Sequence, residues 1–321
     1  MTPLCQVLVA CGLFLWAGCR GQGSPLPLRI AYSTLTPVHA HLGAVFEHTD
    51  ILAKHGIRPE LVRLVRGKDQ ELACREGKFD VVFSCEVPAF FHLQQCPRMR
   101  MVGCPGELGR SALLVTADSP TQRLEDLHHG IIGVEFNQTT HKDLLAWMAE
   151  LGWAPDRDVL VVQADRDRLL DGLLHGQFNA IMAWDPWVEL FQQLHGFRVV
   201  KERMFLSVVF ADETLARNNP EVLQRYFAAL ADAFLWIRQH RNQADQWASE
   251  LSGYPLPVVA NVAAFNRNIN PPADGAPVSL GLTDDRLSIY RGCLDYAIRS
   301  KIVPETWTLD QWVFNLHLPG G

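Results

Sequence analysis

The chain carries one segment twice, and this repeat limits the folds that it can adopt. Gly77–Pro88 reads Gly-Lys-Phe-Asp-Val-Val-Phe-Ser-Cys-Glu-Val-Pro, and Gly176–Pro186 reads Gly-Gln-Phe-Asn-Ala-Ile-Met-Ala-Trp-Asp-Pro. In both copies a polar stretch ends at the glycine, an apolar run follows, and then come an acid (Glu86 or Asp185) and a proline. This order is typical of a helix with a left-handed C-cap, a buried strand, and a new helix that begins on proline.

The repeat predicts two similar α/β lobes. Apolar runs alternate with helical stretches from Leu28 to Val102 and again from Ile131 to Val200, which predicts a mostly parallel sheet in each lobe. One helix is expected around Val38–His55, and two separate strands at Phe197–Val200 and Leu206–Phe210. From Pro220 onward the pattern is helical, and a tail without its own sheet packs most simply on the first lobe. Two extended segments, near Ser111 and at 207–211, would then cross between the lobes, and two crossings permit closure about a hinge.

The N-terminal residues differ from the rest of the chain. Residues 1–18 contain no charged side chain and include an apolar run of the length found in secretory signals, too short to span a bilayer comfortably. Small residues before Cys19 resemble a bacterial lipobox, which implies that Cys19 is lipid-modified; an ordinary secreted protein is the alternative. Gly, Ser and Pro residues then indicate a tether. The predicted division is a signal peptide at 1–18, a tether at 19–26, lobe 1 at 27–110 plus 211–321, and lobe 2 at 111–210.

Cysteine usage does not contradict export. Five cysteines follow Cys19, and because the number is odd at least one thiol is free or pairs elsewhere. Cys96 and Cys104 are the candidates for a bridge, whereas buried free thiols are the favoured alternative.

Charge and motifs exclude several classes of function. The net charge is −6 and no long basic run occurs, which argues against nucleic acid as a partner. The patterns GxSxG, HExxH and GxGxxG and a phosphate loop are absent from the sequence. A metal site is one interpretation of His39, His41 and Glu47-His48. However, histidines two residues apart cannot share one helix face. A polar helix start is the favoured interpretation. We therefore predict no catalytic residue, no cofactor and no metal.

Several short motifs resemble a known family. They occur in the order and spacing found in solute-binding proteins of ABC importers, in the nitrate, taurine and alkanesulfonate group, which also includes binders of thiamine-precursor pyrimidines. The matching pieces are Gly77-Lys-Phe-Asp-Val-Val, Val87-Pro-Ala, Leu124-Glu-Asp-Leu, Gly130-Ile-Ile-Gly-Val, Asn137-Gln-Thr-Thr-His, Leu151-Gly-Trp and Ala183-Trp-Asp-Pro-Trp.

The resemblance implies a type II periplasmic-binding-protein fold, with two βα lobes, a hinge and a C-terminal helical tail. It also implies a non-catalytic, monomeric receptor that faces the periplasm or the cell exterior. This receptor delivers a small polar organic solute, of the aminosulfonate, sulfonate or pyrimidine type, to an ABC permease and its ATPase. A fold-related enzyme of pyrimidine synthesis, or a ligand-sensing domain, is the alternative.

Polar side chains follow the strand ends of lobe 1, where ligands bind in open α/β sheets. Tyr32, Ser33, Thr34 and Thr36 follow the first strand, and their hydroxyls are expected at the cleft floor; turn and cap chemistry is the alternative. Ser84 and Glu86 end the third strand. Glu86 either faces a ligand ammonium group or complements the dipole of the next helix.

Lobe 2 carries a second set of candidate ligand contacts. Asn137, Thr139 and Thr140 open a helix whose free backbone N–H groups bind an anion, unless they form a plain cap. Trp184 is expected to stack on a ligand. Asp185 contacts the ligand or caps the helix that starts on the following proline. Two acids beside helix N-termini favour a ligand with both a positive and a negative end, or a neutral heterocycle, so an aminosulfonate or aminopyrimidine is expected over nitrate.

Overall fold

One continuous mixed sheet runs through the whole molecule. The computed structural model describes residues 24–65, 67–272, 275–316 and 318, and within them nine strands pair in the order β2-β1-β3-β9-β5-β8-β6-β7, with β4 also on β9. The strands are β1 Leu26–Ser33, β2 Ile57–Leu64, β3 Val81–Cys85, β4 Met99–Gly103, β5 Glu107–Val115, β6 Ile131–Val134, β7 Leu160–Gln163, β8 Ala180–Trp184 and β9 Arg198–Asp212.

Helices cover both faces of this sheet. The α-helices are α1 Pro37–His48, α2 Ile51–Lys54, α3 Gly67–Arg75, α4 Glu86–Gln95, α5 Thr139–Glu150, α6 Arg166–Leu174, α7 Trp187–His195, α8 Glu213–Asn218, α9 Pro220–Gln239, α10 Arg241–Ser252, α11 Leu256–Ala263 and α12 Asp284–Arg299; short 3₁₀ turns lie at Leu124–Leu127 and Leu309–Gln311. Among the described residues no helix combines the length and apolarity needed to cross a membrane.

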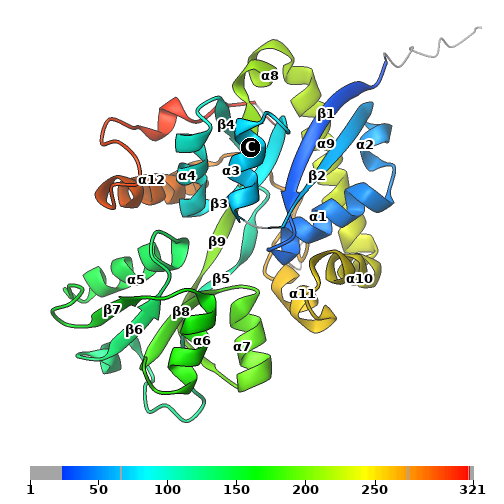
Figure 1. Ribbon diagram of the computed structural model, residues 1–321. Coiled ribbons are helices and arrows are strands. Elements are labelled where there is room, and N and C mark those ends of the chain that lie inside the picture. Colours follow the sequence, from blue (N-terminus) through cyan, green and yellow to red (C-terminus); the bar gives the residue numbers. More distant parts are fainter. Residues whose placement is uncertain (1–23, 66, 273–274, 317, 319–321) are drawn as a thin grey trace, which may run out of the picture.

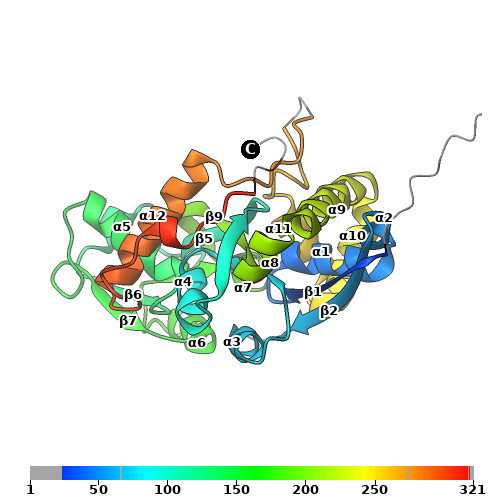
Figure 2. The ribbon, with the colours of Figure 1, turned by 90° about the horizontal axis from the view of Figure 1, so that it is seen from above.

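The molecule has two bodies (Figure 1). We call β1–β4 with α1–α4 and α8–α12 the upper body, and β5–β8 with α5–α7 the lower body. Strand β9 belongs to both: Ser207–Asp212 pair antiparallel with β3 and β4, whereas Arg198–Leu206 pair antiparallel with β5. Figure 2, a view from above, shows α5 lying apart from α1, α2, α9 and α10, with β5 and β9 between them.

The helical tail packs back on the upper body, as expected. Val222, Tyr226 and Phe234 of α9 share one buried core with Leu28 and Ile30 of β1. On the other face of the sheet, Tyr290 and Cys293 of α12 pack with side chains of β3 and α4. The two-body α/β architecture with a C-terminal helical tail is therefore confirmed.

The repeated segment forms the same unit in each body. Gly77 and Gly176 have φ values of 64° and 69°, the left-handed C-cap conformation predicted for them. The strands β3 and β8 follow at the expected positions. The prediction that a new helix begins on proline is wrong in both copies. Pro88 lies inside the first turn of α4, and Pro186 is the N-cap residue of α7.

Three further expectations differ from the structure. The helix expected from Val38 to His55 is two helices, because the chain leaves helical geometry at Thr49. The two strands expected around Val200 and Leu206 form one strand, β9, whose charged middle section pairs with β5. Because β9 and β5 run antiparallel to their neighbours, the sheet is mixed rather than mostly parallel.

Cysteine pairing also differs from the expectation. Cys74 of α3 forms a disulfide with Cys96 at the end of α4, so neither is a free thiol and Cys96 does not pair with Cys104. Cys85, Cys104 and Cys293 are free. The predicted signal peptide, Cys19 and the tether up to residue 23 lie outside the described residues. Leu26, placed in the tether, is already the first residue of β1.

Candidate ligand-binding site

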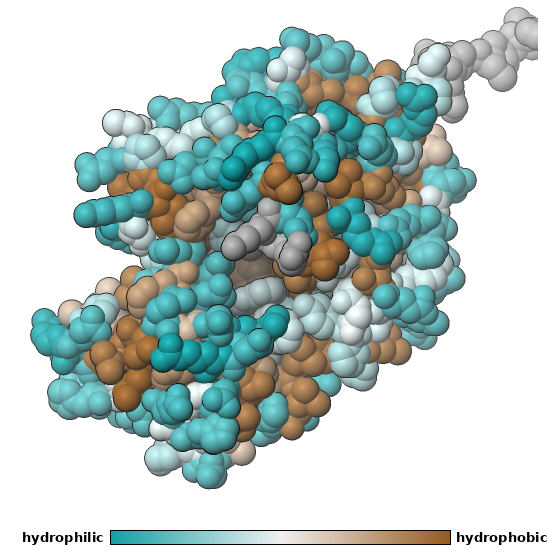
Figure 3. Space-filling view, in the orientation of Figure 1, coloured by the Kyte–Doolittle hydropathy of each residue, from teal (hydrophilic) through white to brown (hydrophobic). Residues whose placement is uncertain are grey.

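The surface is notched between the two bodies (Figure 3). Two long helices, α4 of the upper body and α5 of the lower body, begin at this boundary. Their first turns meet, because the Val87 N–H of α4 donates to Thr139 Oγ1 of α5 at 3.4 Å. The N-termini of helices carry free N–H groups and a partial positive charge. The cleft is therefore bordered by groups that favour an anion.

The start of α1 lies at the same boundary. Thr36 is the N-cap residue of α1, but its side chain makes no capping bond. Its hydroxyl oxygen is buried and has no hydrogen-bond partner. A buried hydroxyl without a partner is costly, and native structures rarely keep one without a reason. Thr36 is therefore a candidate ligand contact.

The lower body contributes a second hydroxyl of this kind. Ser111 of β5 is fully buried, and its hydroxyl oxygen also has no partner. In the sheet it pairs with Trp184 on one side and with Arg203 on the other. Helix α1 contacts β5, so both hydroxyls belong to the region where the bodies meet.

A buried hydrogen-bond chain ties α1 to the end of β3. His39 Nε2 lies 2.8 Å from Ser207 Oγ, and the Ser207 hydroxyl also donates to the Ser84 carbonyl at 3.4 Å. Ser84 Oγ in turn lies 2.8 Å from His92 Nδ1. Burial lowers the pKa of His39 to about 3 and that of His92 to about 4, so both rings are neutral at physiological pH. They help to hold the site without supplying a positive charge.

The acid of the first repeat, Glu86, is fully buried and already paired. Arg203 NH1 donates to its Oε1 at 2.9 Å, and Arg203 NH2 bonds its Oε2. The Leu206 N–H also donates to Oε1 at 2.9 Å. Burial raises the pKa of Glu86, but Arg203, Lys142 and the Leu206 N–H outweigh burial, so the pKa is lowered overall.

The acid of the second repeat is held in the same way. Asp185 is fully buried; Arg110 Nε donates to its Oδ2 at 2.9 Å and Arg110 NH2 to its Oδ1 at 3.1 Å. The N–H groups of Arg110 and Glu189 donate to it as well. Each repeated acid thus receives an arginine and a backbone N–H from a strand that crosses between the bodies: β9 for Glu86 and β5 for Asp185.

The hydroxyls of Tyr32 and Ser33, expected at the cleft floor, make hydrogen bonds within the protein. Tyr32 is buried, with its hydroxyl bonded to Glu47 and its ring packed in the place that a side chain at residue 43 would fill. Ser33 Oγ accepts the Leu35 N–H at 3.1 Å. Thr34 is buried, and its N–H donates to the Leu64 carbonyl.

The start of α5 is only partly as expected. Thr139 and Thr140 are buried at its first two positions, but the N-cap residue is Gln138. Asn137 is exposed with a left-handed φ of 63°. Asp143, one turn into α5, contacts Arg203 rather than forming a capping box with Thr140.

Trp184, at the end of β8, is half-buried against a core cluster that also touches Cys85 of β3. The structure thus brings Ser84, Thr139 and Trp184 near the boundary of the bodies. It gives Glu86 and Asp185 partners inside the protein.

Sequence reasoning missed several residues of this region. Arg110 and Arg203 stand on the crossing strands, and Ser111 lies next to Arg110; nothing in their spacing marks them as partners of the repeated acids. For Arg110, an arginine within a largely apolar strand was the available signal, since a buried arginine needs an acid. Arg203 follows Lys201 and Glu202 in the charged section of β9 and carried no such signal. Sequence reasoning missed Tyr254 as well, which contacts the chain just before α1 and the first residue of α7. The Tyr254 hydroxyl donates to the Leu35 carbonyl at 3.3 Å, and its ring meets Trp187 edge-on at 5.7 Å.

The histidines considered for a metal lie inside the protein. His39 bonds Ser207, and His41 bonds the Pro37 carbonyl and Asp245, each at 2.7 Å. They are buried rather than part of a polar, exposed helix start. Within the described part of the chain, no group of three or more His, Cys, Asp or Glu side chains is placed to hold a metal ion.

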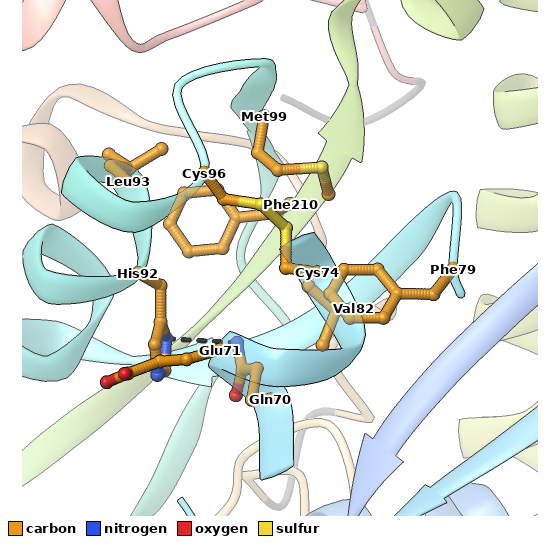
Figure 4. Close-up of a pocket in the computed structure, with 10 residues that line it drawn as sticks. All are labelled: Gln70, Glu71, Cys74, Phe79, Val82, His92, Leu93, Cys96, Met99 and Phe210. Atoms are coloured by element: carbon orange, nitrogen blue, oxygen red, sulfur yellow. Dashed lines mark hydrogen bonds between the residues drawn. A yellow bond between two sulfur atoms is a disulfide. The ribbon is translucent and has the colours of Figure 1, made fainter. Parts of the chain in front are cut away.

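A small cavity elsewhere in the upper body is too tight for a solute (Figure 4). The Cys74–Cys96 disulfide, His92, Phe79 and Phe210 line it. Its volume of about 10 Å³ admits one water-sized sphere at most. This cavity is therefore not a ligand site.

A model of the NMT1-like family matches residues 22–251 of the chain. A Bacillus subtilis (strain 168) protein named for binding aliphatic sulfonates is 22% identical over 311 residues, covering 92% of this chain and 90% of that protein. A 2′-hydroxybiphenyl-2-sulfinate desulfinase of Rhodococcus erythropolis is 23% identical over 290 residues, covering 72% and 77% of the two chains.

The fold is shared with a solved periplasmic protein. The aliphatic sulphonate binding protein SsuA of Escherichia coli superposes with a TM-score of 0.77 at 19% identity, covering 91% of this chain and 92% of that one. The predicted periplasmic-binding-protein fold is thereby confirmed.

Proposed function

This chain belongs to the NMT1-like family, and on that premise we propose that it is a receptor for a small organic sulfonate, which it delivers to an ABC import permease and its ATPase. Two observations carry the proposal: the buried hydroxyls of Thr36, at the start of α1, and Ser111, on β5, have no hydrogen-bond partner, and the first turns of α4 and α5 meet at the boundary of the bodies. Neutral O–H and N–H donors at helix N-termini recognise an anion without a counter-charge. The relatives named for sulfonate binding support the same chemistry.

The ion pairs change the ligand that we expect. An amine on the ligand was expected because Glu86 and Asp185 would face the cleft. Both acids are instead buried and paired with arginines. A ligand ammonium group would have to compete with those arginines, so we propose a plain sulfonate rather than an aminosulfonate or an aminopyrimidine.

Closure about the crossing strands would bring the two sides of the site together. We place lobe 1 at 27–110 plus 211–321 and lobe 2 at 111–210, with the hinge on β5 and β9. The change of partner along β9, from β5 to β3 between Leu206 and Ser207, supports this division. A receptor of this kind acts as a monomer.

The enzyme alternative finds less support. A desulfinase is among the relatives, and a cysteine is the side chain from which a covalent mechanism would start. Cys85 and Cys293 are the free cysteines beside Glu86, and burial, together with the charge of Glu86, raises the pKa of Cys85 to about 12 and raises the pKa of Cys293 as well. A thiol that stays protonated is a poor nucleophile. Turnover of any bound sulfonate or sulfinate by the purified protein would overturn the receptor proposal.

Thermal shift measurements test the ligand class. Butanesulfonate should raise the melting temperature, since a ligand that binds only the folded state stabilises it by mass action. Taurine, butanoate and inorganic sulfate should have smaller effects at the same concentration. A larger response to taurine than to butanesulfonate would contradict the plain-sulfonate proposal. A response to an aminopyrimidine alone would favour a pyrimidine ligand instead.

Thr36→Val tests the proposed contact. We expect affinity for the sulfonate to fall roughly 10- to 100-fold, the effect of one lost hydrogen bond to a charged group. The stability of the ligand-free protein should not fall, because the Thr36 hydroxyl has no partner to lose. Thr49→Val is the matched control at the other end of α1, where the hydroxyl bonds the Val45 carbonyl at 2.7 Å. Calorimetric titration of both variants measures the difference, and equal affinities would remove Thr36 from the site.

Export and lipid anchoring are proposed from the N-terminal sequence. The Cys74–Cys96 disulfide supports an oxidising compartment, where such bonds persist. Cys19→Ala should move the protein from the membrane fraction to the soluble fraction, as followed by immunoblotting of fractionated cells. A mature wild-type protein that begins at Met1 would contradict the proposal.

A further inference from the structure

Two aromatic side chains meet across the boundary of the bodies. Trp187 is the first residue of α7 in the lower body, and Tyr254 lies between α10 and α11 in the upper body. Helices α7 and α11 lie side by side in Figures 1 and 2. The two rings meet edge-on with their centroids 5.7 Å apart, and both rest on Leu190, Val258 and Val262. Each ring stays partly exposed, and we call the pair the aromatic wall.

The aromatic wall lies next to one of the hydroxyls without a partner. The Tyr254 hydroxyl donates to the carbonyl of Leu35, the residue before Thr36, at 3.3 Å. Thr36 is 7% exposed, and its hydroxyl oxygen has no hydrogen-bond partner. Burial raises the pKa of Tyr254 to about 12, so its phenol is neutral at physiological pH. A ligand whose anionic group bonds Thr36 would therefore place its remaining part beside a neutral ring.

The second hydroxyl without a partner also has an aromatic neighbour. Ser111 of β5 stands directly opposite Trp184 of β8 in the antiparallel pairing of these strands. Directly opposed residues project their side chains from the same face of a sheet, with Cβ atoms about 5 Å apart. Trp184 is half-buried. Both candidate contacts for the anionic group thus adjoin an aromatic side chain.

Arg166 holds the aromatic wall in place. It is the first residue of α6, and its guanidinium carbon lies 4.2 Å from the centre of the Trp187 ring, a cation–π contact. The Trp187 ring therefore has Arg166 and Tyr254 as neighbours before a ligand arrives. A surface that is already ordered loses little conformational entropy on binding, so more of the contact energy appears as affinity.

The charges near the aromatic wall do not favour a second anion. Arg166 donates to Asp167 at 3.1 Å. Asp165 is the N-cap residue of α6, and Glu135 follows β6. Burial and the charge of Asp165 raise the pKa of Glu135, whereas the charge of Arg166 acts in the opposite direction. Three acids therefore lie near one arginine, and the aromatic wall suits a neutral group.

We propose that the sulfonate bound by this chain carries a neutral aromatic ring, and that Tyr254 and Trp187 select the ligand by contact with this ring. The inference deepens the proposed function and rests on it. A flat ring gains from aromatic side chains through edge-to-face or offset-stacked contacts in addition to burial. A saturated group of the same size gains burial alone. The ligand class is therefore an arylsulfonate.

Calorimetric titration of the full chain with a panel of sulfonates tests this inference. Benzenesulfonate should bind roughly 2- to 10-fold more tightly than cyclohexanesulfonate, which has the same six carbons but no aromatic ring. 4-Sulfobenzoate should bind more weakly than benzenesulfonate, because the aromatic wall provides no counter-charge for the carboxylate. Butanesulfonate has no ring, so its binding reports on the receptor proposal alone.

Four variants locate the contact. Tyr254→Leu and Trp187→Leu each remove one ring and should bring the affinities for benzenesulfonate and cyclohexanesulfonate closer together. Tyr254→Phe keeps the ring and loses only the bond to Leu35, so the preference for benzenesulfonate should remain. Trp236→Leu is the matched control, because Trp236 of α9 is also half-buried and stacks on Trp247 of α10 at 5.0 Å, within the upper body. It should leave the preference unchanged.

A preference for benzenesulfonate that falls in the two leucine variants of the wall and persists in Tyr254→Phe and Trp236→Leu supports the inference. Equal affinities of the wild type for the two ring compounds overturn it, and this comparison is decisive even where a variant does not fold. An unchanged preference in folded Tyr254→Leu and Trp187→Leu, or tighter binding of 4-sulfobenzoate than of benzenesulfonate, overturns it as well. Binding of butanesulfonate without a preference between the ring compounds overturns this inference alone, whereas failure of every sulfonate to bind overturns the proposed function too.

Discussion

Asp185→Asn should lower the free energy of unfolding by about 3–5 kcal/mol, the typical effect of breaking a buried ion pair. Asp185 is fully buried and accepts from the guanidinium of Arg110 and from two backbone N–H groups. Asparagine has one acceptor oxygen, and its NH₂ group would face a donor. Arg110 would also be left with less compensation for its charge. Denaturant unfolding followed by circular dichroism measures the loss.

Asp167→Asn is the control for this prediction. Asp167 also pairs with an arginine, Arg166, but its side chain is 87% exposed, so its removal should change stability by at most about 1 kcal/mol. If Asp185 only capped a helix, its replacement by asparagine would be nearly silent, because the two residues cap about equally well. Similar small effects for both variants would therefore contradict the ion-pair role of Asp185.

Removing the Cys74–Cys96 disulfide should lower stability by about 3 kcal/mol, since the bond closes a loop with a sequence separation of 22. The bond ties α3 to the end of α4 beside Met99 and Phe210 (Figure 4). The double variant Cys74→Ala/Cys96→Ala should melt several degrees lower than the wild type in a calorimetric scan.

Reductant provides the control for the disulfide. Dithiothreitol should lower the melting temperature of the wild type towards that of the double variant and should leave the double variant unchanged. A wild type that melts at the same temperature with and without reductant, and gains no thiols on reduction, would contradict the bond. Cys85, Cys104 and Cys293 are retained in both proteins, so they do not affect the comparison.

Local patterns determined much of the fold. The glycines of the repeat, Gly77 and Gly176, end their helices in the left-handed conformation, and the apolar runs that follow form β3 and β8 at the predicted residues. These features depend on interactions within a few residues, so the spacing of glycine, apolar run and acid was sufficient. The same patterns carried the resemblance to the family that the chain belongs to.

The chemistry of the candidate site depended on partners distant in the chain. Glu86 and Asp185 stand at equivalent positions of the repeat, and a sequence position alone leaves an acid free to face a ligand, cap a helix or form an ion pair. Arg203 lies 117 residues from Glu86, and Arg110 lies 75 residues from Asp185. Only the antiparallel pairing of β9 with β3, and of β5 with β8, brings these arginines next to the repeated acids.

The sequence by itself therefore determined the repeated helix–strand units, the helical tail and the family, because periodicity, glycine caps and motif order are local properties. The tertiary structure decided which polar groups are already paired. It showed that Glu86 and Asp185 form ion pairs with arginines inside the protein. It also showed that the hydroxyls of Thr36 and Ser111 have no hydrogen-bond partner. Whether a buried polar group is satisfied depends on every residue that packs around it, and those residues come from strands and helices far apart in the chain.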